Sequence, residues 1–327
     1  AVALTSGTAA IHMALILAEV KSGDEVFCST LTFAGSAFPI SYCGATPVFV
    51  DSDTKTWNMD PDLLEKAIKE RIKIGKKPKA CILVHLYGNC ADVEEVTEIC
   101  KKYDISVIED AAESLGTIYK SRHTGTFSDL GVYSFNGNKI ITTGGGGMLV
   151  GKKSEDIDKA RFLSTQARDH YPYYHHSVLG YNYRMSNVLA AIGLGQLEVI
   201  EEKIRKKQKI RNWYKEYLTG FPEIEFIPEN KLERSNCWLT CIIVDDKRTE
   251  VTTEELRIAL ERNNIESRPI WNPMHLQPIY KSAPAYINGV SENLFRTGIC
   301  LPSGTDLTSK DVERICDCIV SALYRRR

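Results

Sequence analysis

The sequence predicts an α/β protein with a mostly parallel sheet covered by helices on both faces, followed by a smaller C-terminal α+β domain. Three observations lead to this prediction. Up to residue 150, short apolar segments alternate with segments in which apolar residues recur at helical spacing. The strand-like segments are apolar throughout, as is typical of strands buried on both faces of a parallel sheet. After residue 150 this alternation stops and a second kind of unit begins.

The predicted elements can be justified in chain order. Short apolar runs bounded by polar or glycine residues predict strands over residues 2–6, 24–30, 46–51, 79–88, 105–110, 130–135 and 146–151. Helical periodicity predicts helices over residues 7–20, 33–44, 60–72, 92–103, 155–167, 186–218, 252–263 and 309–324. The longest helix starts at Ser186, whose hydroxyl is a favourable N-cap.

Three regions are expected along the chain. Residues 1–185 form the large α/β domain, 186–234 a long connecting helix, and 235–327 the small α+β domain. Because the opening residues, AVALTSGT, read as the middle of a strand–turn–helix unit, we expect native sequence to precede Ala1.

The composition narrows the class of protein. The 327 residues carry a formal charge of −1, so no global field favours nucleic acid or an anionic membrane. Ten cysteines occur without a C-x-x-C pair, which favours reduced, buried thiols over a zinc site or a disulfide scaffold. No apolar run reaches the length of a membrane span, and no signal peptide is visible. We therefore expect a cytoplasmic protein with no metal, nucleic-acid or membrane partner.

Polar residues follow several predicted strands. In open parallel sheets, ligands bind outside the carboxyl ends of the strands. This rule predicts that one edge gathers Thr5–Thr8, Asp51, His85, Asp110, Glu113 and Ser134–Lys139. In the first of these segments, TSGTAA joins a strand to a helix, and the free N–H groups of such a helix start favour a phosphate. A helix start that is merely capped is the alternative.

Lys139 stands in the segment SFNGNKIITTGGGG, between a predicted strand and four consecutive glycines. A lysine here could be a surface charge, a phosphate clamp or a nucleophile, and the glycines indicate a backbone that turns or passes close to something. Asp110 ends a strongly apolar strand, where a structural salt bridge or a helix cap is one interpretation. Together, however, Lys139 and Asp110 are the two groups that pyridoxal phosphate chemistry needs: a Schiff-base lysine and an acidic partner for the ring nitrogen.

Seven ordered motifs run through the chain: SGTAAIHMAL, GDEVFCSTLTFAGSA, GATPVFVDSD, EDAAESLG, YSFNGNKIITTGGGGMLV, GYNYRMSNVLAAIGLGQL and RPIWNPMHLQPIY. In these motifs the sequence resembles the pyridoxal-phosphate-dependent nucleotide-sugar aminotransferases of the DegT/DnrJ/EryC1/StrS family, which have the aspartate aminotransferase fold (fold type I). The resemblance implies that Lys139 carries pyridoxal 5'-phosphate as an internal aldimine. It also implies that Asp110 is the partner of the pyridine nitrogen.

Further cofactor contacts are implied by the same resemblance. Gly7, Thr8 and Ser134 correspond to the cup for the cofactor phosphate, and Phe33 corresponds to the aromatic residue stacked on the ring. Asn182 corresponds to an asparagine that reaches the cofactor phosphate of the neighbouring subunit. The resemblance therefore implies a homodimer with shared active sites.

Three more residues match family positions near the cofactor or the sugar. Glu113 is expected beside the cofactor, where relatives often have Gln, and its role is left open because a carboxylate near the phenolic oxygen is repulsive unless protonated or turned away. Arg268 and His275 resemble positions near the sugar-nucleotide pocket.

The implied activity is a ping-pong transfer of an amino group from L-glutamate to a nucleotide-linked keto sugar. The resemblance is greatest to enzymes of polysaccharide biosynthesis that aminate C4 of a UDP-4-keto-6-deoxy-N-acetylhexosamine, such as the N-acetylglucosamine derivative. Three alternatives stay open. One is a non-catalytic sensor of the same fold that binds the cofactor or a nucleotide sugar. Another is a related sugar-modifying enzyme such as a dehydratase, in which histidine replaces the lysine. The third is a plain α/β scaffold with no cofactor.

Overall fold

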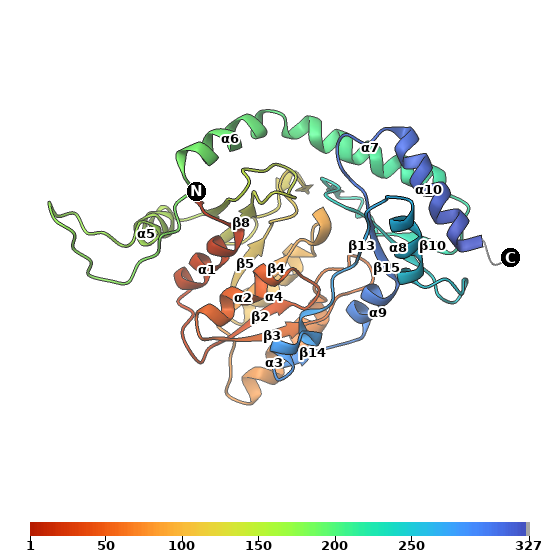
Figure 1. Cartoon of the computed structure of the whole chain (residues 1–327). Coiled ribbons are helices and arrows are strands. Elements are labelled where there is room, and N and C mark those ends of the chain that lie inside the picture. Colours follow the sequence, from red (N-terminus) through yellow and green to blue (C-terminus); the bar gives the residue numbers. More distant parts are fainter. Residues whose placement is uncertain (325–327) are drawn as a thin grey trace.

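The computed structural model describes residues 1–324, and its central feature is an eight-stranded sheet with the order β1-β9-β8-β5-β4-β2-β3-β14 (Figure 1). Its strands are β1 (Val2–Leu4), β2 (Glu25–Ser29), β3 (Thr46–Val50), β4 (Ala80–Val84), β5 (Ser106–Asp110), β8 (Leu130–Ser134), β9 (Gly147–Gly151) and β14 (Ala285–Tyr286). From β8 to β14 all neighbours are parallel, whereas β9 is antiparallel to both β8 and β1. The predicted mostly parallel sheet is confirmed.

Helices cover both faces of this sheet. Helices α1 (Gly7–Leu17), α2 (Ala34–Tyr42) and α5 (Ser154–Ser164) share one apolar core with the sheet, and α3 (Pro61–Lys73) and α4 (Val93–Lys102) share the other. Strand β2 shows why both faces are apolar. Successive side chains of a strand point to opposite faces, so Val26 and Cys28 lie in the first core while Phe27 lies in the second.

A smaller unit follows, built on a four-stranded antiparallel sheet with the order β10-β12-β15-β13. Its strands are β10 (Ile224–Phe226), β12 (Thr240–Val244), β13 (Arg268–Pro269) and β15 (Gly298–Leu301). Helices α7 (Ile200–Leu218), α8 (Thr253–Arg262) and α10 (Ser309–Tyr324) pack on this sheet and share its core, and α9 (Val290–Thr297) leads into β15. A third, short sheet has the order β11-β6-β7, from β11 (Glu233–Arg234), β6 (Ile118–Tyr119) and β7 (Arg122–His123).

The structure adds short strands and the helix α9 to the predicted elements, and it differs from them most clearly at the long helix and at β10 and β14. The single helix expected over 186–218 consists of α6 (Asn187–Glu198) and α7, separated at Val199, where ψ is 11°. The two- and three-residue strands β10 and β14 have no sequence pattern of their own. Although β10 lies in the predicted connecting segment, it pairs with β12, and β14 of the predicted small domain pairs with β3.

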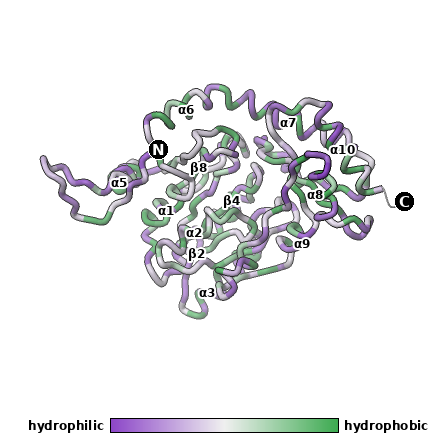
Figure 2. Tube along the Cα trace, in the orientation of Figure 1, coloured by the Kyte–Doolittle hydropathy of each residue, from purple (hydrophilic) through white to green (hydrophobic). Residues whose placement is uncertain are grey.

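Helix α6 is apolar but contains no buried residue. Val188 is 71% exposed and Leu194 is 67% exposed. Figures 1 and 2 show the helix at the rim of the chain, next to α7 and away from the central sheet. Apolar helix faces normally pack on a core, so this one is available to a partner. None of the described helices combines the length and apolar character needed to cross a membrane.

Candidate active site

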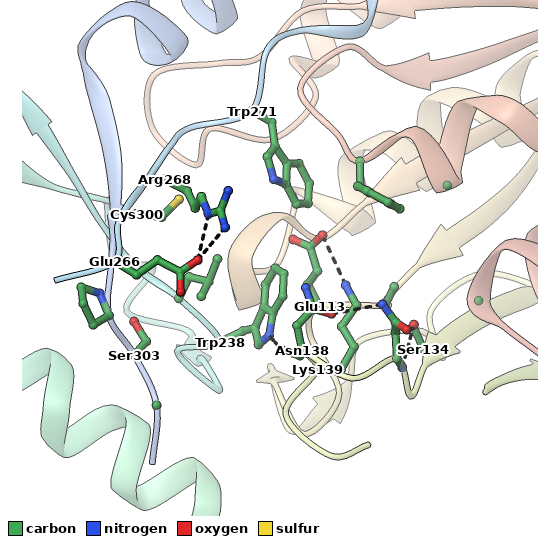
Figure 3. Close-up of a pocket in the computed structure, with 18 of the residues that line it drawn as sticks. Glu113, Ser134, Asn138, Lys139, Trp238, Glu266, Arg268, Trp271, Cys300 and Ser303 are labelled. Carbon is green, nitrogen blue, oxygen red and sulfur yellow. Dashed lines mark hydrogen bonds and ion pairs between the residues drawn. The ribbon is translucent and has the colours of Figure 1, made fainter. Parts of the chain in front are cut away.

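A cavity of about 1110 Å³ opens between the carboxyl edge of the large sheet and the small unit (Figure 3). Eight of the residues predicted for the site line it together: Gly7, Thr8, Phe33, Asp110, Glu113, Ser134, Lys139 and Arg268. The sheet rule explains why residues so far apart in sequence meet, since most of them follow parallel strands at one edge.

One end of the cavity is formed by the start of α1. Ser6 caps the helix by accepting a hydrogen bond from the N–H of Ala9 (3.0 Å), while the N–H groups of Gly7 and Thr8 lack intrahelical acceptors. Gly7 lies so close to the end of β8 that a Cβ atom there would sit 3.0 Å from the Cβ of Ser134. Free N–H groups, a hydroxyl and the positive end of a helix dipole form a suitable site for a phosphate.

Asp110 is the last residue of β5. It lines the cavity and contacts α2 through Ser36. Its carboxylate accepts hydrogen bonds from the Ser36 hydroxyl (2.6 Å) and the Ala112 N–H (3.1 Å). Both donors are neutral, so they fix the carboxylate without cancelling its charge. A buried carboxylate of this kind, only 5% exposed, suits a protonated ring nitrogen.

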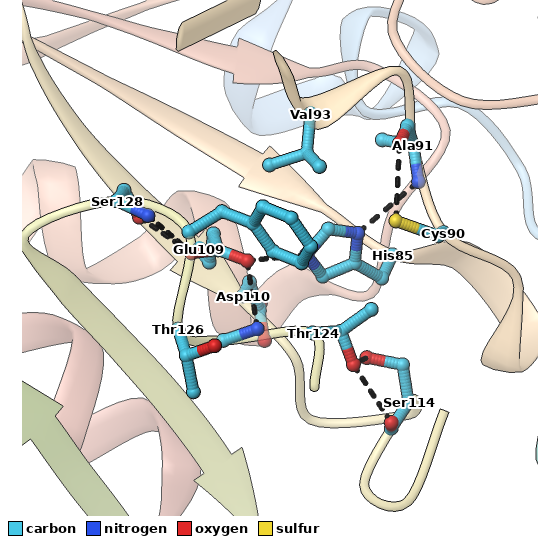
Figure 4. Close-up of polar contacts among 12 residues, drawn as sticks. His85, Cys90, Ala91, Val93, Glu109, Asp110, Ser114, Thr124, Thr126 and Ser128 are labelled. Carbon is cyan, nitrogen blue, oxygen red and sulfur yellow. Dashed lines mark hydrogen bonds and ion pairs between the residues drawn. The ribbon is translucent and has the colours of Figure 1, made fainter. Parts of the chain in front are cut away.

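The neighbouring Glu109 points to the opposite face of the sheet and fixes the strand end (Figure 4). It accepts hydrogen bonds from Ser128, from the Gly125 N–H (2.7 Å) and from His85. Because the Nδ1 atom of His85 accepts from the Ala91 N–H (3.1 Å), its Nε2 carries the proton donated to Glu109 (3.0 Å). Burial raises the pKa of Glu109, but the hydrogen bonds from His85 and Ser128 outweigh it and lower this pKa overall.

Two residues predicted for the same edge do not line the cavity. His85 is fully buried in the contacts just described. Asp51 is also fully buried, and it accepts hydrogen bonds from the N–H groups of Asn288, Gly289 and Ser291 and from the Ser291 hydroxyl. The strand-end rule therefore does not hold for Asp51, whereas the placement of His85 agrees with a structural role for that residue. Asp51 is instead the anchor of the segment that begins α9.

Lys139 lines the cavity from the loop that joins β8 to β9. Its Nζ atom is 3.9 Å from Oε1 of Glu113 and 4.2 Å from the centroid of the Trp238 ring. The other carboxylate oxygen of Glu113 accepts a hydrogen bond from the Tyr87 N–H (2.7 Å). Burial raises the pKa of Glu113 to about 7, although the charge of Lys139 acts in the opposite direction. Glu113 is therefore the titrating neighbour of Lys139 near neutral pH.

Sequence reasoning missed the aromatic wall of the cavity. The Trp271 ring lies 5.9 Å from Phe33, 6.4 Å from Trp238 and 5.0 Å from Tyr87, measured between ring centroids. Both tryptophans belong to the small unit, where no rule comparable to the strand-end rule selects residues. Their size and their places, one residue removed from the start of β12 and from the end of β13, were the available signal.

The remaining predicted residues lie in different settings. Arg268 lines the cavity with a 77% exposed side chain that pairs with Glu266 (2.6 Å). His275 is not among the lining residues, and its ring binds the Thr30 hydroxyl (2.6 Å) and Glu292 (3.2 Å). Asn182 is exposed and forms an isolated bridge with Thr165, away from the cavity of its own chain. The roles of His275 and Asn182 stay predictions, and that of His275 is not supported by its placement.

The cavity residues fit pyridoxal phosphate. The start of α1 and Ser134 can hold a phosphate, Asp110 can face a ring nitrogen, and Phe33 offers a ring that is 59% exposed. The amine of Lys139 lies among these groups with a side chain only 9% exposed. These are the contacts that the cofactor's phosphate, pyridine ring and aldehyde require.

Comparison with known proteins agrees with this geometry. A sequence profile described as the DegT/DnrJ/EryC1/StrS aminotransferase family matches residues 1–320. EpsN of Bacillus subtilis (strain 168), named as a candidate pyridoxal phosphate-dependent aminotransferase, is 47% identical over 328 residues, covering 99% of this chain and 84% of EpsN. A GDP-perosamine synthase of Escherichia coli O157:H7 is 40% identical over 319 residues, covering 98% of this chain and 84% of that protein.

Solved structures give the same result. A DegT DnrJ EryC1 StrS aminotransferase from Brucella abortus has a TM-score of 0.91 at 29% identity, covering 99% of this chain and 86% of that one. The PLP form of Spr1654 from Streptococcus pneumoniae, named as a candidate sugar aminotransferase, has a TM-score of 0.89 at 28% identity, with 99% and 87% covered. The fold-type-I prediction is confirmed.

Proposed function

Because the chain belongs to the DegT/DnrJ/EryC1/StrS family and is a pyridoxal-phosphate-dependent sugar aminotransferase, we propose that it moves an amino group from L-glutamate to a nucleotide-linked keto sugar. The acceptor we propose is C4 of a UDP-4-keto-6-deoxy-N-acetylhexosamine. The observation that carries the proposal is the placement of Lys139 among Asp110, Glu113 and the start of α1 in one cavity.

Each residue has a defined task in this reaction. Bound pyridoxal phosphate supplies the electron sink for the substrate carbanion. Gly7, Thr8 and Ser134 would bind the phosphate, and the Asp110 carboxylate would keep a proton on the ring nitrogen. The Lys139 amine would hold the cofactor through its aldehyde carbon. Once released, it would take the proton from the substrate carbon and deliver it to that cofactor carbon.

The size and charge of the cavity support a sugar-nucleotide acceptor. Its volume of about 1110 Å³ exceeds the several hundred Å³ typical of small-ligand sites, which leaves room for a nucleotide sugar beside the cofactor. Arg268 reaches this space from β13 and offers a guanidinium suited to a diphosphate. A GDP-linked 4-keto sugar is the competing acceptor, because relatives include proteins named GDP-perosamine synthase.

We propose a homodimer with shared active sites. The apolar helix α6, which contains no buried residue, supports it, because exposed apolar patches of this kind mark interaction surfaces. Asn182 lies on the stretch of chain just before α6 and would contact the cofactor phosphate of the partner. We place the enzyme in the cytoplasm.

Two alternative functions, a sugar dehydratase and a sensor, can each be distinguished from the proposed aminotransferase. In dehydratases that resemble this family a histidine replaces the lysine, so Lys139 argues against that activity. A sensor of the same fold would bind the cofactor or the sugar nucleotide and would not respond to L-glutamate.

Absorption spectra of the purified protein with pyridoxal phosphate test the proposal. We expect a visible band from the lysine-bound cofactor, its replacement by a near-ultraviolet band on addition of L-glutamate, and its return with the UDP-linked keto sugar. Lys139→Ala is the control and should lack the visible band. A bound cofactor that ignores L-glutamate would contradict the donor, and return of the band only with the GDP-linked sugar would contradict the acceptor. Size-exclusion chromatography with light scattering tests the dimer.

A further inference from the structure

Trp238, a residue of the small unit, contacts the loop between β8 and β9 that contains Lys139 (residues 135–146, the lysine loop). Its indole N–H donates to the carbonyl oxygen of Asn138, the residue before Lys139 (2.9 Å). The face of the same ring lies 4.2 Å from Nζ of Lys139, and Trp238 is only 3% exposed. One buried side chain therefore contacts both the backbone and the reactive atom of the lysine loop.

The backbone of Trp238 is held in turn from α7. The Lys207 ammonium donates to the carbonyl oxygens of Trp238 (2.9 Å) and Ser303 (2.8 Å). Lys207 is 8% exposed, and burial lowers its pKa to about 8. A buried lysine is costly unless its N–H groups are satisfied, and these two carbonyls belong to residues that line the cavity. Lys207 thus links Trp238 and Ser303, two residues of the cavity wall, through their carbonyl oxygens.

The amine of Lys139 has two close neighbours of different character. The Glu113 carboxyl lies 3.9 Å away, and the Trp238 ring lies on another side. Among the other titratable groups, the Asp110 carboxylate lines the same cavity, Tyr87 is buried behind Glu113 and donates its backbone N–H to it, and Lys207 lies behind Trp238. The negative face of an aromatic ring stabilises a nearby ammonium.

We propose that Trp238 is a positioning residue for Lys139, whose ring stabilises the free ammonium and whose indole N–H fixes the lysine loop, and that Lys207 holds Trp238 in this place. This inference rests on the proposed role of Lys139. Lys139 must leave the cofactor and act as an acid and a base in each half-reaction, and Trp238 provides its ammonium with a fixed resting position beside Glu113.

Pulse acetylation of the cofactor-free protein tests the inference without activity. The Lys139 peptide is quantified by mass spectrometry after brief exposure to acetic anhydride at several pH values. In Trp238→Leu the ammonium loses the ring, so at about pH 8 we expect Lys139 to react about threefold to tenfold faster than in the wild type, the range of a partly desolvated cation–π contact. The comparison is repeated at pH values where the labelling rate of each protein no longer rises with pH. Both amines then react in their neutral form, so the difference should disappear.

The loss of the rate difference at high pH distinguishes stabilisation of the ammonium from steric shielding of Lys139. If Trp238 only shielded the amine, its removal would speed acetylation at every pH. Trp238→Phe keeps the aromatic face and should react within about twofold of the wild type. Trp271→Leu removes a tryptophan of the same cavity that does not contact Lys139, and it should leave the Lys139 labelling rate unchanged. Equal rates in Trp238→Leu and the wild type, or a difference that persists at high pH, would overturn the proposal.

Lys207 variants keep the test decisive if Trp238→Leu does not fold. Lys207→Met releases the Trp238 carbonyl, so Lys139 labelling should rise in the same pH-dependent way. Lys207→Arg retains hydrogen-bond donors, and it should lie between Met and the wild type. Wild-type rates in Lys207→Met would overturn the part assigned to Lys207. A wild-type protein that forms no visible band with pyridoxal phosphate would contradict the proposed function alone, since the acetylation does not use the cofactor.

Discussion

Replacing Glu113 with Gln should change the stability of the cofactor-free protein in a pH-dependent way. Burial raises the pKa of this carboxyl from 4.5 to about 7. The folded protein therefore binds its proton more tightly than the unfolded chain does, and stability falls as the pH rises between these two values. At 1.36 kcal/mol per pH unit, the complete effect is roughly 3 kcal/mol. Most of it, roughly 2–3 kcal/mol, lies between about pH 5 and about pH 8.

Urea unfolding of the wild type and Glu113→Gln at these two pH values measures this effect. The amide does not titrate, and its oxygen can still accept the Tyr87 N–H, so the difference between the two proteins isolates the carboxyl. We expect the variant to gain roughly 2–3 kcal/mol relative to the wild type on going from the lower to the higher pH. Glu216→Gln, at an exposed position of α7, is the matched control. A difference that is the same at both pH values, or that changes in the opposite direction, would refute the reasoning.

Three further predictions concern single substitutions outside Glu113. Gly7→Val should weaken pyridoxal phosphate binding more than about tenfold in a fluorescence titration, because a Cβ at this position would lie 3.0 Å from Ser134; Gly137→Ala, with open space around it, is the control. Asp51→Ala should lower the free energy of unfolding by about 2–4 kcal/mol, measured with urea, since the buried donors of Ser291 and two partly buried N–H groups lose their acceptor; an unchanged midpoint would contradict this. Val188→Asp on α6 should convert the proposed dimer to monomers in light scattering, and a dimer that persists would exclude α6 from the interface.

The sequence predicted the large sheet well because its signal is strong there. Strands such as Ala80–Val84 and Ser106–Asp110 are buried on both faces and bounded by polar residues, so apolar runs and their ends coincide with strands and their ends. The strand-end rule then selected Asp110 and Lys139 correctly as neighbours of one cavity. The same rule failed for Asp51, because the sequence does not reveal that the segment before α9 returns to this edge and occupies that carboxylate.

The elements that were missed depend on contacts between segments distant in sequence. Strand β14 consists of two residues that become a strand only by pairing with β3, more than two hundred residues earlier in the chain. The break between α6 and α7 falls at Val199, within a continuous helical pattern. Here α7 packs into the core of the small unit, whereas α6 buries no residue in this chain. Neither the strand with which β14 pairs nor the core on which α7 packs can be predicted from a local sequence pattern.

The site itself shows the same division between the two units. The predicted residues that line the cavity come almost entirely from the large sheet, where position at a strand end indicates position in space. Trp238 comes from the small unit, where Lys207 binds its carbonyl oxygen, and its indole N–H donates across the boundary to the Asn138 carbonyl. A tryptophan before an apolar strand reads as core in the sequence, and it is indeed buried. Its contact with the reactive amine arises from how the two units pack, so residues of this kind are the ones that sequence reasoning about a two-unit active site will miss.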